Sequence, residues 1–330
     1  MRIAVLMGGA SSEREVSLAS GREVARALKG MGHQVVEIDV KDELDTSHSS
    51  SPSGNNKALV NFVSNPDIAS SEIVFIALHG GAGEDGTVQV LLDVMGKPYT
   101  GSGMLASALA MDKFISKRMF EHAGIPTPDW RSVENADLKK VEAAVSELGG
   151  LPIVTKPKNQ GSTIGVSIIK EETQVASAVE SALKYSPDVL VEKYIVGREI
   201  TVGILGNKAL PVIEVAPEKG FYDYECKYTR GKSKYIVPAK IAESKSREAQ
   251  DLALKAYHVL GCQDFARVDF RLSHDGQLHC LEVNTIPGMT GTSLVPMAAR
   301  ASGTEFPRLV DEICRLALSR RGIAVPSKAN

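Results

Sequence analysis

Runs of apolar residues alternate with polar and glycine-rich segments from the start of the chain. Strands are predicted at 3–7, 34–40 and 73–78, and a helical pattern separates the first two. The run at 73–78 is continuously apolar, as expected of a buried parallel strand. Glycine-rich segments at 8–12 and 79–86 each follow one of these strands. The pattern therefore predicts βαβ units, with both loops at the carboxyl edge of a parallel sheet, where ligands bind.

The rest of the chain also alternates between strand-like and helix-like patterns of apolar residues. A helix that Ser102 can cap is expected to end near 123–124, before Pro126. The elements expected next are helix 136–148, strand 152–156, strand 165–170, helix 171–185 and strand 189–194. In the last third of the chain, the pattern predicts a hairpin at Gly206-Asn207 between strands 199–205 and 208–215. A long loop at 217–235 and helix 246–260 are expected after it.

Two strands predicted at 265–273 and 277–284 are joined by Asp275-Gly276, a strong signal for a two-residue hairpin turn. With that turn, His274 pairs with Gln277. The same register sets two further pairs, Asp269 with Glu282 and Arg267 with Asn284. Alternation then gathers on the opposite face the apolar side chains Val268, Phe270, Leu281 and Val283.

The paired carboxylates of Asp269 and Glu282 are expected to need a cation between them. Directly opposed side chains have Cβ atoms about 5 Å apart, and like charges at that separation repel. Oxygen ligands without a nearby Cys or His indicate Mg²⁺, which usually accompanies a nucleotide phosphate. The alternative is a solvated polar face that carries an accidental pair.

Composition limits the classes of protein. The chain has 330 residues, 43% hydrophobic and 24% charged, as in an ordinary globular protein of about two to three domains. A formal net charge of −2 gives no support for nucleic-acid or membrane-surface binding. No apolar run approaches the roughly 20 residues of a membrane span, and no signal-peptide core opens the chain. The four cysteines lack zinc or CxxC spacing, so reduced thiols in a cytoplasmic enzyme are expected.

Two acidic residues open the first helix, and their spacing gives them different roles. Ser12 and Glu15 form a capping-box pattern, which assigns Glu15 a structural role. Glu13, at the first helical position, is then left to face the loop, where the helix dipole also favours a carboxylate. The alternative is that Glu13 is an ordinary helix-start acid. His79, in the second glycine-rich loop, is a further site candidate.

Four later segments each allow a functional and a structural interpretation. Residues 156–165 can bring backbone N–H groups and Lys156 to phosphate oxygens, or form a flexible hairpin. Residues 189–195 can line an adenine or act as a linker. The loop 221–234, with its tyrosines and lysines, can be a lid that excludes water or a solvated surface loop. Gly288 lets its N–H approach an oxyanion closely, although this segment can also simply end a strand.

Taken in order, these segments resemble those of the D-alanine–D-alanine ligases. The segments that carry the resemblance are GGASSEREVS, LHGGAGEDG, MDK, KPKNQGSTIGV, VEKYIVGREIT, FYDYECKYT, ARVDF and LEVNTIPGMTGTSLVP. They cover nearly the whole chain, and the combination of EREVS, the Lys-Tyr of the lid loop and NTIPGMT followed by Ser is specific to this family. The resemblance implies an α/β ATP-grasp fold with a Rossmann-like parallel sheet at the N-terminus and nucleotide held between the central and C-terminal domains. The implied domains are 1–105, 106–196 and 197–330, the last with a lid loop at 217–235.

The resemblance also implies roles for individual residues. The nucleotide-binding set is Lys113, Lys156, Glu192, Lys193, Ile195 and Glu199. The ligands of two Mg²⁺ ions, or of Mn²⁺ in their place, are Asp269, Glu282 and Asn284. The catalytic set is the triad Glu13, Ser162 and Tyr228, the oxyanion pair Arg267 and the Gly288 N–H, and Ser293. The substrate contacts are Glu13 and His79 for the first substrate, and Lys227, Ser293 and the Leu294 N–H for the second.

The activity implied is ATP-dependent ligation of two D-alanines through an acyl phosphate, with release of ADP and phosphate, for peptidoglycan precursor synthesis. The expected partners are D-alanine and ATP, and the expected form is a cytoplasmic homodimer. Two alternatives remain open. Another ATP-grasp ligase or carboxylase is disfavoured by Tyr228 with Ser293. A dinucleotide-binding oxidoreductase or nucleotide sensor is suggested by Asp39 at the end of the second strand, but no GxGxxG follows the first strand.

Overall fold

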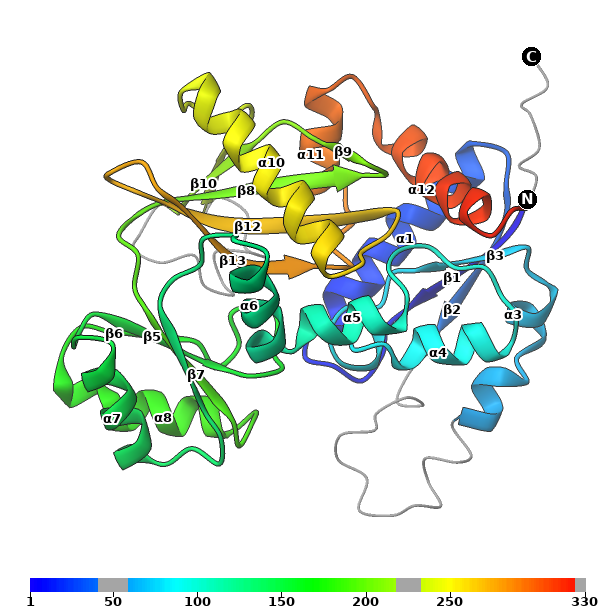
Figure 1. Ribbon diagram of the computed structural model, residues 1–330. Helices are drawn as coiled ribbons and strands as arrows, with labels where there is room; N and C mark the ends of the chain where they lie inside the picture. The colour runs from blue at the N-terminus through cyan, green and yellow to red at the C-terminus, as the bar shows by residue number, and fades with distance from the viewer. Residues whose placement is uncertain (41–58, 218–232, 324–330) are drawn as a thin grey trace.

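The computed structural model describes residues 1–40, 59–217 and 233–323. Within these residues the strands form three sheets, each accompanied by helices (Figure 1). Most of the predicted lid loop, including Lys227 and Tyr228, lies outside the described residues.

The N-terminal sheet is parallel, as predicted. Its strands, in the order β2-β1-β3, are β1 (Arg2–Met7), β2 (Gln34–Asp39) and β3 (Ile73–Ile76). Helix α1 (Arg14–Gly30) connects β1 to β2. The two glycine-rich loops meet at one edge of this sheet, where the Ser11 hydroxyl donates a hydrogen bond to the carbonyl oxygen of His79 at 2.5 Å. The expectation that both loops share the carboxyl edge is therefore confirmed.

The single long helix predicted after Ser102 is in fact two helices, α5 (Met104–Met111) and α6 (Lys113–His122). Asp112 separates them, because its carboxylate accepts the N–H groups of the second and third residues of α6 at 3.0 and 3.1 Å. Ser102 caps neither helix, and its hydroxyl accepts the N–H of Gln263. Three elements that were not predicted precede them: α3 (Pro66–Ser70), the 3₁₀ turn η2 (Gly81–Gly83) and α4 (Thr87–Val94).

The second sheet is antiparallel, in the order β4-β7-β5-β6. Its strands are β4 (Trp130–Val133), β5 (Ile153–Pro157), β6 (Ser167–Ile169) and β7 (Val189–Lys193). Its helices are α7 (Leu138–Glu147) and α8 (Val175–Leu183), the latter preceded by the 3₁₀ turn η3 (Glu172–Gln174). Both helices share a buried apolar cluster with the sheet and lie together on one side of it (Figure 1). Strand β4 was not predicted, and the segment after β5 joins two adjacent antiparallel strands, as the hairpin interpretation required.

The third sheet runs in the order β11-β10-β8-β12-β13, and β9 also pairs with β8. Its strands are β8 (Gly197–Leu205), β9 (Lys208–Ala209), β10 (Ile213–Pro217), β11 (Ser233–Ile236), β12 (Phe265–Ser273) and β13 (Leu278–Asn284). Helix α10 (Glu243–Val259) covers one face of it (Figure 1). The strand predicted at 208–215 is two short strands, and the last residues of the predicted lid loop belong to β11.

The pairs predicted near the site end of the β12–β13 hairpin are confirmed: Asp269 lies opposite Glu282, and Arg267 opposite Asn284. Beyond Asp269 the register shifts by one residue, as in a β-bulge. Cys280 therefore replaces Leu281 in the apolar core, and the prediction that Leu281 faces the core is wrong. Leu281 is partly exposed and lines a cavity described below.

The turn of this hairpin also differs from the prediction. The N–H of Ser273 donates to the carbonyl oxygen of Gln277 at 2.9 Å, so these two residues pair and the turn holds three residues instead of two. Gly276 adopts a φ of 82°, which suits glycine at the end of a three-residue hairpin loop. The Ser273 side chain closes this longer turn, since its Oγ accepts the Gln277 N–H at 3.1 Å and contacts the carboxylate of Asp275. The bulge compensates for the extra turn residue and restores the predicted pairs at the site.

Helices from one part of the chain pack against sheets from another. The C-terminal helices α11 (Leu294–Ala301) and α12 (Phe306–Arg320) share a buried apolar cluster with α1, β1 and β3. Figure 1 shows α12 beside α1. Helices α5 and α6 contribute to the cluster between the third sheet and α10. The three sheets lie within the predicted segments 1–105, 106–196 and 197–330, whereas these helices link one segment to another. Among the described residues, no helix is both long and apolar enough to span a membrane.

Ile313 on α12 is fully buried in the cluster shared with the N-terminal sheet, so Ile313→Ala should lower the free energy of unfolding by about 2–5 kcal/mol. Urea unfolding followed by circular dichroism measures this change. The control is Leu183→Ala on α8, where the side chain is 38% exposed and the expected change is within about 0.5 kcal/mol. Equal effects of the two substitutions would contradict a core that includes α12.

Candidate active site

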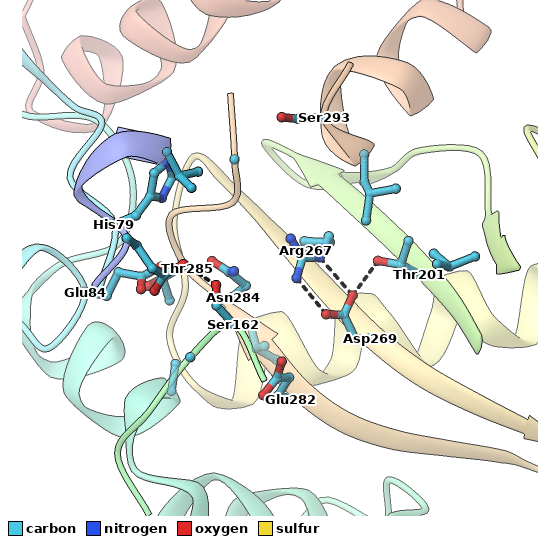
Figure 2. Close-up of a pocket in the computed structure, with 18 of the residues that line it drawn as sticks. His79, Glu84, Ser162, Thr201, Arg267, Asp269, Glu282, Asn284, Thr285 and Ser293 are labelled. Carbon is cyan, nitrogen blue, oxygen red and sulfur yellow. Dashed lines mark hydrogen bonds and ion pairs between the residues drawn. The ribbon is translucent and has the colours of Figure 1, made fainter. Parts of the chain in front are cut away.

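A cavity of about 470 Å³ is lined by residues of the N-terminal loops, the β5–β6 loop and the third sheet (Figure 2). The described residues among the predicted catalytic, substrate-binding and metal-ligating sets all line it: Glu13, His79, Ser162, Arg267, Asp269, Glu282, Asn284, Gly288, Ser293 and Leu294. Residues predicted from segments far apart in the sequence therefore gather around one space.

Asp269 on β12 accepts hydrogen bonds from two side chains that line the cavity. Arg267 donates to both of its oxygens, from Nε to Oδ1 at 2.9 Å and from an Nη to Oδ2 at 2.7 Å. Thr201 lies opposite Asp269 on the neighbouring strand β8 and donates its hydroxyl to Oδ1 at 2.6 Å (Figure 2). On the neighbouring strand, Glu282 lies 3.9 Å from the ammonium of Lys113. Cations of the protein itself therefore flank the two opposed carboxylates. Thr201 was not predicted, because the sequence alone does not indicate that β8 lies beside β12.

Glu13 points into the cavity, although the capping box that was used to select it does not form. Glu13 itself occupies the N-cap position of α1, and its N–H donates to Ser11 Oγ at 3.2 Å. Its side chain is buried and its carboxylate accepts a hydrogen bond from the Ser162 hydroxyl, whereas Glu15 is exposed. Ser162 has a φ of 49°, a strained conformation for a residue with a side chain. The capping prediction failed because the helix starts after Ser12 and its N-cap lacks a side-chain hydrogen bond.

Glu84 also lines the cavity and was not predicted. Its side chain is buried, and Oε2 accepts the N–H of Gly80 at 2.8 Å. Burial, followed by the charge of Glu13, raises the pKa of Glu84 to about 8, so this carboxyl holds its proton at neutral pH. A β-carbon placed on Gly161 would lie 3.4 Å from Glu13 Oε2 and 3.9 Å from Glu84 Oε2, so both carboxyls face the same point. The glycine-rich loop identified the region but not this residue.

The segment after β13 closes another side of the cavity. A β-carbon on Gly288 would lie 3.1 Å from Ser293 Oγ, so Ser293 faces this glycine closely. Ser293 Oγ accepts the Thr290 N–H at 3.0 Å, which makes the segment a compact turn. Ser293 is the N-cap residue of α11 and Leu294 is its first residue. This corner therefore presents a hydroxyl and a helix N-terminus, both suited to an anion.

A second, narrower cavity adjoins the first between the second and third sheets. All residues of the predicted nucleotide-binding set line it: Lys113, Lys156, Glu192, Lys193, Ile195 and Glu199. Lys113, Glu199, Asp269 and Glu282 line both cavities. The two carboxylates of the hairpin therefore stand at the junction of the two spaces.

A buried carboxylate between two lysines forms part of the wall of the second cavity. Glu192 lies 2.7 Å from the ammonium of Lys117 and also contacts that of Lys156. Burial alone would raise the pKa of Glu192, but the two lysines outweigh it and lower this pKa to about 2. Burial opposes the charge of Lys156 too, yet Glu192 and Glu282 raise its pKa above the ordinary value. Lys117 was not predicted, although its position four residues after Lys113 on α6 places it on the same face of that helix.

A Mg²⁺ site at the hairpin is compatible with the side chains that are present. Asp269, Glu282 and Asn284 supply oxygen donors, which Mg²⁺ prefers. In the part of the chain that the structure describes, no three His, Cys, Asp or Glu side chains cluster as metal ligands. A complete metal site would therefore also need the amide oxygen of Asn284 and oxygens from a bound ligand. The Asn284 oxygen accepts the N–H of Ile286 at 3.1 Å, and this hydrogen bond orients it.

Asp39, which suggested a dinucleotide site, has a different environment. Arg14 donates to both of its carboxylate oxygens at 2.9 and 2.7 Å, and also to the carbonyl oxygen of Gly9 at 3.1 Å. A β-carbon on Gly8 would collide with Asp39. Asp39 thus ties the first glycine-rich loop to β2, which accounts for this residue without a ribose.

Comparisons with known proteins agree along the whole chain. Residues 2–102 match the family model described as D-ala D-ala ligase N-terminus, and residues 119–315 match D-ala D-ala ligase C-terminus. The D-alanine–D-alanine ligase of Moorella thermoacetica is 49% identical over 325 residues, 96% of this chain and 99% of the relative. The crystal structure of D-alanine–D-alanine ligase from Bacillus anthracis complexed with ATP superposes with a TM-score of 0.80 at 33% identity, covering 98% and 99% of the two chains. That of the VanG D-Ala:D-Ser ligase from Enterococcus faecalis gives 0.78 at 30% identity, covering 96% and 99%.

The three sheets and these superpositions define a ligase of the ATP-grasp fold, as the motifs predicted. The chain belongs to the D-alanine–D-alanine ligase family.

The raised pKa of Glu84 makes stability depend on pH. Between the ordinary value of 4.5 and about 8, the folded protein holds a proton that the unfolded chain releases, so the contribution of Glu84 to stability falls as pH rises. Glu84→Gln mimics the neutral form at every pH. In thermal denaturation, the difference in melting temperature between this variant and the wild type (variant minus wild type) should therefore increase from pH 5 to pH 8. A difference that stays constant between pH 5 and pH 8 for Glu84→Gln would refute the shift.

Proposed function

We propose that the protein joins two D-alanine molecules into D-alanyl-D-alanine and converts ATP to ADP and phosphate. The observation that carries this proposal is the opposition of Asp269 and Glu282 at the junction of the two cavities. A nucleotide in the narrower cavity would direct its terminal phosphate to this junction, and an amino acid in the larger cavity would meet it there. The relatives named for this reaction, one of them complexed with ATP, support the choice of substrates.

The first step activates a carboxylate, which is a poor acyl donor by itself. A carboxylate oxygen of the first D-alanine forms a bond to the γ-phosphorus of ATP, the bond between that phosphorus and the β,γ-bridging oxygen breaks, and ADP leaves. Lys113 and Lys156 would attract the phosphates, while Glu13, fixed by Ser162, would hold the ammonium of the amino acid. Mg²⁺ ions held by Asp269, Glu282 and Asn284 would offset the negative charge of the phosphates.

The second step forms the peptide bond. The free amine of the second D-alanine attacks the acyl carbon, and phosphate leaves with the oxygen that linked it to that carbon. The proton that the nitrogen loses leaves on the phosphate. Arg267 and the N–H of Gly288 would stabilise the oxyanion of the tetrahedral intermediate. Ser293 and the N–H of Leu294, at the start of α11, would receive the carboxylate of the second D-alanine. Lys227 would join them at that carboxylate. Tyr228 would belong to a lid that keeps water from the acyl phosphate.

We extend the proposal to the setting of the reaction. A dipeptide of D-alanine serves peptidoglycan precursor synthesis, which places the protein in the cytoplasm. The acceptor is proposed to be D-alanine in preference to D-lactate, because a hydrogen-bonded lid of Tyr228, Ser162 and Glu13 would favour the amine as the nucleophile. D-serine is a second competitor to test, since one structural relative is named for it.

The proposed form in solution is a homodimer. Helices α4 and α5 are neighbours, and together they expose apolar side chains: Val90, Val94, Met104 and Leu105 are 40%, 78%, 43% and 65% exposed. An exposed apolar group of this kind on adjacent helices is typical of a subunit interface. Val94→Glu with Leu105→Glu should therefore convert a dimer to a monomer in sedimentation velocity. A wild type that sediments as a monomer at micromolar concentration would contradict the proposal.

The function is tested by incubating the protein with ATP, Mg²⁺ and equal amounts of D-alanine, D-serine and D-lactate at neutral pH. D-alanyl-D-alanine is expected as the main product by mass spectrometry, with one phosphate released per dipeptide. A different main product, or hydrolysis of ATP without coupling, would overturn the proposal.

Two variants locate the reaction at the junction of the cavities. Glu282→Gln should abolish product formation at an unchanged melting temperature, because it removes one charge of the metal-ligand pair. Glu248→Gln makes the same change at an exposed position on α10 and should retain full activity. Normal turnover by Glu282→Gln would rule out the metal role of this residue.

A further inference from the structure

The side chain of His79 is fully engaged by two other parts of the chain. It is 4% exposed, its Nδ1 lies 3.0 Å from the carbonyl oxygen of Ile286, and its Nε2 lies 3.0 Å from the hydroxyl of Ser20 on α1. Ser20 is fully buried, and its hydroxyl oxygen also accepts the N–H of Met289 at 3.2 Å. These contacts connect the loop after β3, helix α1 and the segment after β13.

The direction of each hydrogen bond follows from the partners. A carbonyl oxygen only accepts, so Nδ1 of His79 must carry a proton and donate it to Ile286. Burial lowers the pKa of His79, more than Glu13 and the Ile286 carbonyl raise it, so the ring is neutral and Nε2 is an acceptor. The hydroxyl of Ser20 then donates to Nε2 and accepts from Met289. Every donor and acceptor in this chain of hydrogen bonds is satisfied in one arrangement only.

This arrangement holds both ends of a four-residue turn. His79 binds the carbonyl of Ile286 and Ser20 binds the N–H of Met289, and Gly288 lies between these two points. Ile286 and Met289 are themselves buried, so the turn has little freedom to rotate. One turn further along α1, Glu23 accepts the N–H of Gly291 at 2.6 Å and fixes the segment again.

Helix α1 also carries Glu13 at its N-cap, seven residues before Ser20. Seven residues of helix span about 10 Å, and a helix of this length is a rigid spacer. A shift of the turn relative to α1 would therefore change the distance between the group proposed to hold the first substrate and the amide of Gly288.

We infer that Ser20 and His79 are positioning residues that aim the N–H of Gly288 at the carbonyl oxygen of the reacting acyl group, where the oxyanion develops. This inference rests on the proposed function, in which that N–H stabilises the oxyanion. His79 then acts through the turn, because both of its ring nitrogens are occupied by protein partners, and it contributes by orientation instead of by binding substrate. A displacement of about 1 Å at a reacting group costs up to roughly 100-fold in rate, so an indirect role of this kind has a measurable effect.

The test uses Ser20→Ala with Ser17→Ala as a matched control. Both serines are fully buried on α1, and each accepts one backbone N–H and donates one hydrogen bond. Ser17 joins Gly8 to Ala77, the residues that directly follow β1 and β3, whereas Ser20 joins Met289 to His79. The two substitutions remove equivalent groups, so they should lower the melting temperature by similar amounts.

In Ser20→Ala, kcat for D-alanyl-D-alanine should fall roughly 10- to 100-fold while the KM for ATP keeps the wild-type value. Ser17→Ala should keep kcat as well. Hydrogen–deuterium exchange of the peptide that contains 286–291 should be faster in Ser20→Ala than in the wild type or Ser17→Ala. A loss of activity through general loosening would instead accelerate exchange across the N-terminal sheet.

The outcomes separate this inference from the proposed function. If the wild type makes no dipeptide, the proposed function is wrong and the comparison of kcat values no longer applies. If the wild type is active but Ser20→Ala exchanges like the wild type at 286–291, the inference is overturned. It is equally overturned if exchange rises while kcat matches that of Ser17→Ala, because the turn would then have no role in aiming the amide.

Discussion

Compensation of negative charge in the cavity is the constraint on which the site depends. Several carboxyl groups line this space, and four of them are stabilised in different ways. Glu84 keeps its proton, Glu13 binds the Ser162 hydroxyl, Asp269 is paired with Arg267 and Thr201, and Glu282 lies near Lys113. An isolated carboxylate loses its hydration on burial and would be too costly without such partners. The partners come from the β5–β6 loop, the third sheet and helix α6, so these parts of the chain must assemble before the charges can be balanced.

The same requirement explains why the C-terminal helices return to the N-terminal sheet. The segment that follows β13 carries Gly288 and Ser293 and must meet the loops after β1 and β3. Helix α1 makes this contact through Ser20 and Glu23, and α11 and α12 bury apolar surface against the same sheet. Packing of that apolar surface stabilises an arrangement in which the polar contacts of the turn are made with little freedom to move.

Two predictions reached the correct residue through an incorrect local argument. The two-residue turn at Asp275-Gly276 is a three-residue turn, yet Asp269 still faces Glu282, because the bulge at Leu281 offsets the extra residue. The capping box at the start of α1 does not form, yet Glu13 is buried in the cavity and Glu15 is exposed. At the hairpin, the alternation of side chains was a stronger restraint than the detailed turn, since a slip of one residue would move every side chain to the other face. At α1, Glu13 reaches the cavity as the N-cap residue beside the glycine-rich loop, without a capping box.

The sequence by itself determined the parallel N-terminal sheet, the β12–β13 pair and the glycine-rich loops, because these depend on periodicity and on neighbours close in the chain. Tertiary structure alone decided that Thr201 donates a hydrogen bond to Asp269 and that Glu84 keeps a proton. It also decided that His79 donates a hydrogen bond to the carbonyl of Ile286, 207 residues away. Such contacts leave no local pattern, because hydrogen bonding and burial at each position depend on elements distant in the chain. The lysines around Glu192 are an intermediate case, since Lys113 and Lys117 share a helix face but only the packed sheet brings that carboxylate between Lys117 and Lys156.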